Sequence, residues 1–360
     1  MTNVAEKSGA RLVQPVLFGV LFVALIALPR SALATPPITV GDGTAASCTE
    51  AALRDGLTAA GSRGGDTIRF RCGGGHVTIT LSATLTPPDK TTIDGGGLIT
   101  LDGARAVRVV FVGRDATVVL KRLSISNGTS DLSGAGVYNE GTLTVHNCTF
   151  SGNRAIRTGG GIFNEGTLTV HDSTFSRNSA EGGGGIVNRG TVTVDNSTFS
   201  GNVADIGGGI LNNGTLTVKN TSFSGHDSVA GAAIDNRGIA TVDNSTISEN
   251  LGGFLNGGGG VYNEGMLSIN NSTISSNSAK GVGGGIFNEG TLIISNSIIS
   301  ENTGGYGGGI YNGGALTVNN STITQNIAQE AGGGIYTCCG GILTLENTSV
   351  TGNTPDDVVP

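Results

Sequence analysis

The stretch GGGIFNEGTLTVHDSTFSRN, residues 159–178, decides the fold because close copies of it fill most of the chain. Its anchor is Asn164, and the same position recurs as Asn139, Asn188, Asn212, Asn236, Asn263, Asn288 and Asn312, with Thr337 in a ninth copy. Successive anchors lie 25, 24, 24, 24, 27, 25, 24 and 25 residues apart. A fixed period of this length is typical of a solenoid, in which each copy forms one layer and buries its apolar side against its neighbours.

Each copy reads as a set of short β-strands separated by glycine-rich turns. In residues 167–170 the alternation places Leu168 and Val170 on one face and two threonines on the other. Residues 161–163 precede this strand and residues 173–176 follow it, with Phe175 facing inward. We therefore predict an all-β fold, a parallel β-helix with coils of 24–25 residues and three short strands per coil.

Stacking of the coils would turn the columns of the repeat into ladders. An apolar column reads Phe150, Phe175, Phe199, Phe223, Ile247, Ile274, Ile298, Ile323 and Val350. Three residues beyond it stands an asparagine column, which His226 interrupts: Asn153, Asn178, Asn202, Asn250, Asn277, Asn302, Asn326 and Asn353. We interpret this column as a structural ladder in left-handed backbone whose amides bond the coils on either side, and expect a second ladder at the anchor asparagines.

Residues 1–34 have the pattern of a secretory signal peptide. Lys7 and Arg11 form a basic start, residues 12–28 form an apolar run, and the small residues 32–34 provide a cleavage site. An uncleaved membrane anchor is the alternative, which Pro15 within the apolar run disfavours. We expect a secreted protein, extracellular or at the cell surface, with no stable membrane span after cleavage.

The remainder divides into four segments. Residues 35–63 form an N-terminal cap, because the segment from Thr49 to Leu57 has the apolar spacing of a short amphipathic helix. Residues 64–133 read as irregular β-helix coils, residues 134–353 as the regular repeats, and residues 354–360 as a C-terminal tail.

Composition excludes one class of partner. The chain carries a net charge of −7, and only 13% of its residues are charged, so it lacks the basic stripe that nucleic acid binding needs. The 63 glycines stand at fixed offsets beside apolar residues and are structural rather than a sign of disorder. The sequence indicates no cofactor and does not define an oligomeric state.

The five cysteines fit an oxidising compartment. Cys48 and Cys72 flank the predicted helix, and we expect a disulfide between them. Cys338 and Cys339 are adjacent and either close a strained ring or stay reduced. Cys148 takes a position that is serine in most other copies, which favours a small buried thiol.

The paired motifs Gly159-Gly160-Gly161-Ile162 and Phe175-Ser176-Arg177-Asn178 resemble the repeat of polymorphic outer membrane proteins. The resemblance covers about residues 134–353, and it implies a right-handed parallel β-helix of the pectin-lyase-like class. The opening stretch from Ala51 to Gly103 is similar to the N-terminal part of many secreted bacterial β-helix proteins. Both resemblances imply adhesion and carbohydrate contact at a cell surface more than catalysis.

Carboxylates are the first candidates for chemistry. Polysaccharide lyases and hydrolases need acidic groups gathered on one face. Asp94 and Asp102 in the irregular coils are the candidate catalytic residues. The turn column holds two pairs, Glu140 with Glu165 and Glu264 with Glu289, which are candidate metal ligands. The alternative is that these four side chains point into solvent and lean on Arg189 and Arg237.

Two outward columns suggest binding surfaces. Tyr262, Phe287, Tyr311 and Tyr336 would form an exposed aromatic stripe, a candidate site for a polysaccharide or cell-surface ligand. The alternative is that glycine-rich turns cover the stripe. The paired threonines of residues 142–217 resemble the surface of β-solenoid ice-binding proteins, although threonine is also a common outward strand residue.

Three functions therefore stand as predictions. The first is a non-catalytic protein that takes part in adhesion or binds carbohydrate or another surface. The second is a polysaccharide lyase or glycoside hydrolase of the pectin-lyase-like class, and ice binding is a distant third.

Overall fold

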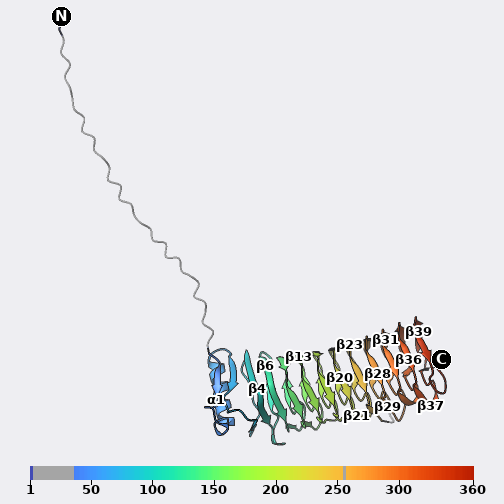
Figure 1. Cartoon of the computed structure of the whole chain (residues 1–360), viewed down its shortest axis with the longest axis horizontal. Helices are drawn as coiled ribbons and strands as arrows, with labels where there is room; N and C mark the ends of the chain where they lie inside the picture. The colour runs from blue at the N-terminus through green and yellow to red at the C-terminus, as the bar shows by residue number, and fades with distance from the viewer. Residues whose placement is uncertain (3–35, 254–256) are drawn as a thin grey trace. The chain divides into compact units, whose positions relative to one another are not determined.

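Each copy of the repeat folds as one turn of a parallel β-helix, and its strands pair with the equivalent strands of the neighbouring turns. The computed structural model describes residues 1–2, 36–253 and 257–360, and residues 37–360 form one unit (Figure 1). The predicted signal peptide falls on residues that lie outside this description, apart from the first two. In the described part, no helix is long and apolar enough to cross a membrane.

The first strand column of the regular repeats carries the TLTV-like segments. Its strands are β9 (Thr142–His146), β13 (Thr167–His171), β16 (Thr191–Asp195), β19 (Thr215–Lys219), β23 (Ile239–Asp243), β27 (Met266–Asn270), β31 (Thr291–Ser295), β35 (Ala315–Asn319) and β39 (Ile342–Glu346). The register sets Leu168 opposite Val192, so inward residues meet inward residues. The paired threonines of residues 142–217 also stand in register on the outer face.

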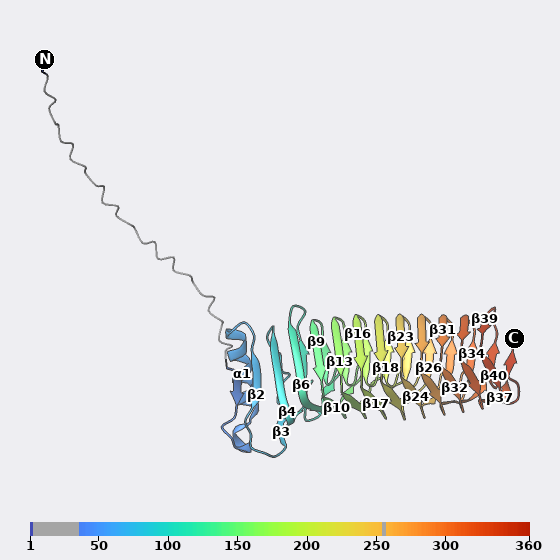
Figure 2. The ribbon, with the colours of Figure 1, turned by 45° about the horizontal axis from the view of Figure 1, so that its top comes forward.

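The second column follows after a bend and belongs to the same sheet. It contains β10 (Thr149–Ser151), β14 (Thr174–Ser176), β17 (Thr198–Ser200), β20 (Ser222–Ser224), β24 (Thr246–Ser248), β28 (Thr273–Ser275), β32 (Ile298–Ser300), β36 (Thr322–Thr324) and β40 (Ser349–Thr351). Figure 2 shows these strands succeeding one another in sequence order.

The third column forms a second sheet and ends at the anchor position. Its strands are β5 (Val110–Val112), β8 (Val137–Asn139), β12 (Ile162–Asn164), β15 (Ile186–Asn188), β18 (Ile210–Asn212), β22 (Ile234–Asn236), β26 (Val261–Asn263), β30 (Ile286–Asn288), β34 (Ile310–Asn312), β38 (Ile335–Thr337) and β41 (Val358–Val359). The predicted C-terminal tail contains β41, which pairs with β38.

The structure confirms the parallel β-helix with three strands per coil, and it adds a short fourth strand in some coils. These strands are β7 (Thr129–Ser130), β11 (Arg154–Ala155), β21 (Asp227–Ser228), β25 (Leu251–Gly252), β29 (Ser278–Ala279), β33 (Thr303–Tyr306) and β37 (Ile327–Ala331). They follow the asparagine column, where the sequence shows glycine-rich turns and no clear alternation, so the prediction missed them.

The N-terminal coils are covered by a helix, as predicted. Helix α1 (Glu50–Ser62) follows a 3-10 turn, η1 (Ala45–Ser47), and Thr49 caps it by accepting a hydrogen bond from the Ala52 N–H. Leu53, Leu57 and Ala60 of α1 are buried against the first coils. The strands here are β1 (Ile38–Val40), β2 (Thr67–Phe70), β3 (Val77–Thr80), β4 (Thr91–Asp102) and β6 (Thr117–Ser126).

Aromatic rings stack in the interior. Phe150, Phe175, Phe199 and Phe223 are fully buried, with successive ring centroids 4.6, 4.7 and 4.8 Å apart. The expected continuation is wrong at one position. Ile299 pairs with Ile274 in this column, whereas the predicted Ile298 pairs with Thr273 and is 46% exposed.

The asparagine ladder is confirmed as a structural feature. Asn178 Nδ2 donates to Asn202 Oδ1 at 2.9 Å and to the Phe150 carbonyl at 3.0 Å, and the same pattern recurs from coil to coil. The anchor column forms the expected second ladder, with Asn164 Nδ2 donating to Asn188 Oδ1 at 3.0 Å. Left-handed backbone was expected at the first ladder, and this is wrong: it lies in the turns, for example at Asn196 and Arg177.

Cys48 and Cys72 form a disulfide that joins the segment just before α1 to the segment just after β2, 24 positions away. We expect the double substitution Cys48→Ser/Cys72→Ser to lower the free energy of unfolding of the N-terminal coils by about 3 kcal/mol, because the closed loop restricts the unfolded chain. Urea denaturation of both proteins measures this difference. Equal midpoints would show that α1 is held by burial alone.

Cys148 is a buried free thiol, and burial raises its pKa to about 11. Its Sγ lies 3.4 Å from the His146 carbonyl, the contact that serine hydroxyls make in later coils. We expect Cys148→Ser to change the free energy of unfolding by less than about 1 kcal/mol. We also expect the native thiol to resist alkylation, which mass spectrometry checks. Rapid modification at neutral pH would contradict this assignment.

Candidate functional site

The aromatic stripe that we expected on the surface is largely buried. Tyr262 and Phe287 are only 2% and 5% exposed, so the expected exposure is wrong for these two residues, and Tyr311 and Tyr336 are half-buried. The rings of Tyr262, Phe287 and Tyr311 stack at 5.2 and 4.9 Å. Ligand binding by this ladder stays a prediction, and only Tyr311 and Tyr336 offer it accessible ring surface.

The same column forms a second apolar layer further toward the N-terminus. Phe163, Val187 and Leu211 are buried there, and Ile206 packs against them. Ile206 belongs to the turn that precedes the next strand, so chain from the turns covers the column. The alternative raised from the sequence, that turns fold over the stripe, describes this layer.

The turn glutamates lean on tyrosine and arginine side chains. The Tyr262 hydroxyl lies 2.7 Å from Glu264 Oε1 and 2.9 Å from Glu289 Oε2. Burial and these two carboxylates raise the pKa of Tyr262. Glu165 accepts from the Tyr138 hydroxyl at 3.0 Å and lies 3.5 Å from Arg189.

Arginine side chains lie beside the turn glutamates. Arg237 approaches Glu264 at 3.7 Å and pairs with the buried Asp235 at 2.9 Å, in agreement with the alternative that arginines support these carboxylates. Over residues 36–253 and 257–360, no group of three or more His, Cys, Asp or Glu side chains is arranged to hold a metal ion.

The two catalytic candidates occupy different environments. Asp94 is 5% exposed and pairs with Arg122 through contacts of 2.8 and 2.5 Å. Burial alone would raise the pKa of Asp94, but the hydrogen bonds from Arg122 and Gly96 lower it overall. Asp94 is therefore held in an ion pair. Asp102 accepts from the Asn127 amide at 2.9 Å and from the Ala104 N–H at 2.7 Å, so it supports a residue that faces a groove.

That groove, of about 1060 Å³, lies over the outer face of the second strand column in the N-terminal half. Strands β4, β6 and β10 supply its floor through the hydroxyls that alternate with inward apolar residues, while β7, β11 and the turns supply its walls. It is lined by Thr100, Arg105, Ser124, Ser126, Asn127, Thr129, Asp131, Ser151, Gly152, Arg154, Ile156, Arg177 and Ser179. The lining combines a row of hydroxyls with three arginines, one carboxylate and no aromatic ring.

The three arginines of the groove are exposed. In the described part of the chain, the side chains of Arg105, Arg154 and Arg177 are exposed and make no hydrogen bond or ion pair. Other arginines nearby are structural: Arg122 pairs with Asp94, and Arg108 donates to the Gly134 carbonyl at 2.9 Å. The groove therefore presents positive charge that the fold itself does not use.

Arg177 stands at a turn position with left-handed backbone. Its φ is +54°, and the adjacent coils place Gly152 and Gly201 there. Later coils place Glu249, Ser276, Glu301 and Gln325 at the same position with a similar φ, so this turn accepts polar side chains of several kinds. The contribution of Arg177 to the groove therefore rests on its charge and exposure.

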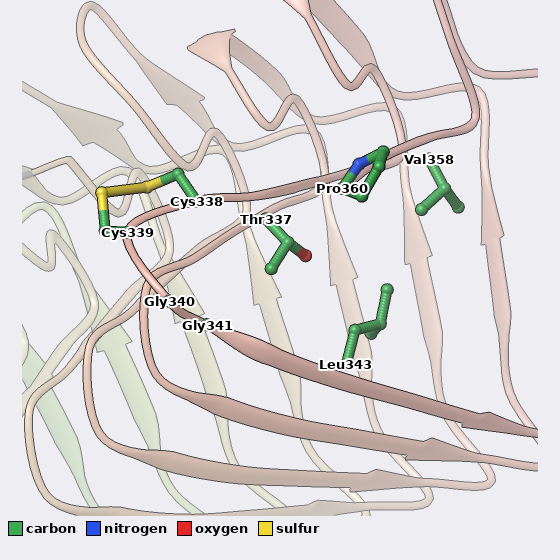
Figure 3. Close-up of a pocket in the computed structure, with 8 residues that line it drawn as sticks. All are labelled: Thr337, Cys338, Cys339, Gly340, Gly341, Leu343, Val358 and Pro360. Atoms are coloured by element: carbon green, nitrogen blue, oxygen red, sulfur yellow. A yellow bond between two sulfur atoms is a disulfide. The ribbon is translucent and has the colours of Figure 1, made fainter.

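A second concavity, of about 430 Å³, lies beside β38 and β39. Figure 3 shows its lining side chains, with Thr337, Leu343 and Val358 around one space and the disulfide of Cys338 and Cys339 at its rim. Cys338 also contacts the Tyr311 hydroxyl at 2.8 Å. None of its lining side chains is charged, so it has no positive group to attract an anionic ligand, unlike the arginine groove.

Sequence reasoning missed the groove because it searched for acids and aromatics in fixed columns. Arg154 and Arg177 come from different columns, and Arg105 precedes the regular repeats, so only the fold brings them together. One signal was available. Arg154 directly follows the ladder residue Asn153, and Arg177 directly precedes the ladder residue Asn178, so the two arginines flank the same asparagine column.

Comparisons with known proteins identify the fold. A family model described as "Right handed beta helix region" matches residues 102–229 and 208–356. Among solved structures, the A-module of mannuronan C-5 epimerase AlgE4 from Azotobacter vinelandii is 15% identical in sequence to this chain. The match covers 88% of this chain and 96% of the AlgE4 module, with a TM-score of 0.43. The AlgE6 A-module from the same organism is also 15% identical, with coverages of 90% and 99% and a TM-score of 0.40.

A comparison with curated proteins finds no match. The family model covers residues 102–356, which is well over half of the chain. Its handedness agrees with the prediction of a right-handed parallel β-helix, and the chain belongs to the right-handed β-helix family.

Proposed function

We propose that this chain is a secreted β-helix protein that binds an acidic polysaccharide in the groove of Arg105, Arg154 and Arg177. The observation that carries the proposal is a set of three exposed guanidinium groups beside rows of hydroxyls, and these groups have no partner in the described part of the chain. Guanidinium groups bind carboxylate or sulfate groups through paired hydrogen bonds, and serine and threonine hydroxyls exchange hydrogen bonds with sugar hydroxyls. A non-catalytic role in adhesion or carbohydrate binding follows.

The shape and lining of the groove favour a polysaccharide over other anions. Its floor spans successive coils, from Thr100 through Ser124 to Ser151, so it suits a linear polymer more than a compact molecule. Binding of single-stranded nucleic acid usually relies on aromatic rings that stack on bases, and the groove lining has none. The net charge of −7 also disfavours binding to nucleic acid.

Two features support secretion. The first 34 residues have the pattern of a signal peptide, and the structure contains disulfides at Cys48–Cys72 and Cys338–Cys339, which persist in oxidising compartments. The resemblance of the repeat to polymorphic outer membrane proteins supports a place at the cell surface.

Lyase or hydrolase activity is the second candidate, and one observation favours it. Asp131 lines the groove beside the arginines, so a bound sugar would contact both a carboxylate and cationic groups. Asp102 accepts a hydrogen bond from the side chain of Asn127, which also lines the groove. Asp131 was not singled out from the sequence. Replacement of Asp131 with Asn separates the two functions, because an enzyme would lose turnover, whereas a binding protein would retain or improve its affinity for an anion.

The test is calorimetric titration of the chain with sodium alginate, sodium polygalacturonate and dextran sulfate, with uncharged dextran as the control. The proposal expects saturable binding to at least one anionic polymer, weaker binding at high salt, and no binding to dextran. The same mixtures are assayed for new reducing ends and unsaturated products. Binding to dextran alone, or to none of the polymers, would reject the groove as an anion site.

A further inference from the structure

His226 takes the place of an asparagine in the middle of the buried ladder. Its side chain is 1% exposed, and its Nδ1 accepts a hydrogen bond from the Asn202 N–H at 3.0 Å. The His226 N–H in turn donates to Asn250 Oδ1 at 3.0 Å. The imidazole thus replaces the acceptor function of an asparagine in the link between two coils.

The imidazole does not replace the donor function. At an ordinary step, Asn178 Nδ2 donates to Asn202 Oδ1 and to the Phe150 carbonyl. His226 Nε2 is buried and has no hydrogen bond partner within residues 36–253 and 257–360. The series of hydrogen bonds between side-chain amides is therefore interrupted between Asn202 and Asn250.

The buried ring of His226 lies between backbone and an aromatic side chain. A Cβ at Gly209 would lie 3.2 Å from His226 Nε2, and the Phe223 ring centroid lies 6.3 Å from that of the imidazole. Strands β17, β20 and β24, which surround it, carry only serine, threonine, phenylalanine and isoleucine. The neighbouring Asp227 is exposed. Among the described residues, no carboxylate pairs with the His226 ring.

We propose that His226 is an acid-sensitive hinge, whose protonation opens the coils of residues 199–253 while the coils further away stay folded. Protonation would put a hydrogen on Nδ1, which would then face the Asn202 N–H donor at 3.0 Å and lose that bond, leaving only the longer 3.3 Å approach to the Asn202 carbonyl. It would also leave a positive charge in an apolar interior. Because each coil touches only its neighbours, the opening is expected to remain local.

The direction of the pH effect follows from the shift in pKa. Burial lowers the pKa of His226 from 6.5 to about 4, against a smaller opposing effect of the Asn202 and Phe199 carbonyls. An open coil would bind the proton at the ordinary pKa of 6.5, so the closed form loses stability as pH falls from about 6.5 to about 4. The open population should rise about 10²-fold over this window.

Hydrogen exchange followed by mass spectrometry tests the hinge at about pH 7 and about pH 4, after correction for the intrinsic exchange rates. In the natural chain, peptides from residues 199–253 should lose protection in acid more than peptides from residues 280–330. His226→Asn, which restores the ladder residue, should abolish that difference. His226→Gln, which also lacks a titrating group, provides a second variant should the first fold poorly.

His171→Asn is the matched control, because His171 is a half-exposed histidine in an adjacent part of the solenoid. It should leave the acid response unchanged. Two results would overturn the proposal: equal loss of protection in the natural chain and His226→Asn, or an acid response spread evenly over the whole solenoid. The second result would point to general acid denaturation.

Discussion

Replacement of Arg105, Arg154 and Arg177 together with glutamine should weaken binding of the acidic polysaccharide about 100-fold. Each guanidinium group is exposed and forms no ion pair with the residues that the structure describes, so it can contact an anionic sugar without first breaking such a pair. An exposed charge-assisted contact contributes about 1 kcal/mol, or roughly fivefold in affinity, and three such contacts multiply. Titration of both proteins with the polymer that binds in the panel measures the change.

A control must show that position matters and not charge alone. The triple substitution Arg69→Gln, Arg71→Gln and Arg114→Gln removes the same charge from exposed positions outside the groove lining. This control should lower the affinity for the polymer less than threefold, because it changes only the overall electrostatic potential of the protein. Equal losses in both triple variants would mean that the chain attracts polyanions without a defined site.

Salt dependence provides a second check on the groove variant. Because the contacts of the natural protein are ionic, its affinity should fall as salt is added, and that dependence should become shallower in the groove variant. The variant should keep its thermal stability, since none of the three side chains takes part in a hydrogen bond or ion pair of the described fold.

The periodicity of the sequence predicted the scaffold well because a solenoid is built from nearest-neighbour contacts. A residue such as Phe175 meets the same position of the next copy, Phe199, so a column read from the sequence is a contact in space. The asparagine ladder could be foreseen for the same reason. Ile298 and Ile299 show where this prediction fails. Either of two adjacent isoleucines fits the apolar column from the sequence, and only the strand register in the structure identifies Ile299 as the inward residue.

The candidate site was harder to predict because it depends on departures from the repeat. The groove gathers Arg105 from an irregular coil with Arg154 and Arg177 from two different columns. The aromatic stripe failed for a different reason. Strand alternation gives Tyr262 an outward direction, but it does not show that glycine-rich turns bring further chain over that face.

Asn178→Leu should produce the largest loss of stability among the changes considered, about 3–5 kcal/mol in the affected coils. Asn178 Oδ1 accepts hydrogen bonds from the Asn153 backbone N–H at 3.1 Å and from the Asn153 side-chain amide at 2.9 Å. Asn178 Nδ2 donates to the Phe150 carbonyl and to Asn202 Oδ1. Leucine has the same branching as asparagine but is larger, and it would leave these buried backbone groups without their hydrogen bonds. Hydrogen exchange of peptides covering residues 150–202 measures the loss.

His226 provides a matched comparison within the same ladder. Asn178→His should cost about half as much as Asn178→Leu near neutral pH, because an imidazole nitrogen can accept from the Asn153 N–H as His226 Nδ1 accepts from Asn202. In acid that advantage should disappear, since a protonated ring has no acceptor, and the two variants should converge. Identical destabilisation at both pH values would mean that side-chain volume, and not the hydrogen bond across coils, governs this position. The ladder would then be a consequence of stacking and not one of its causes.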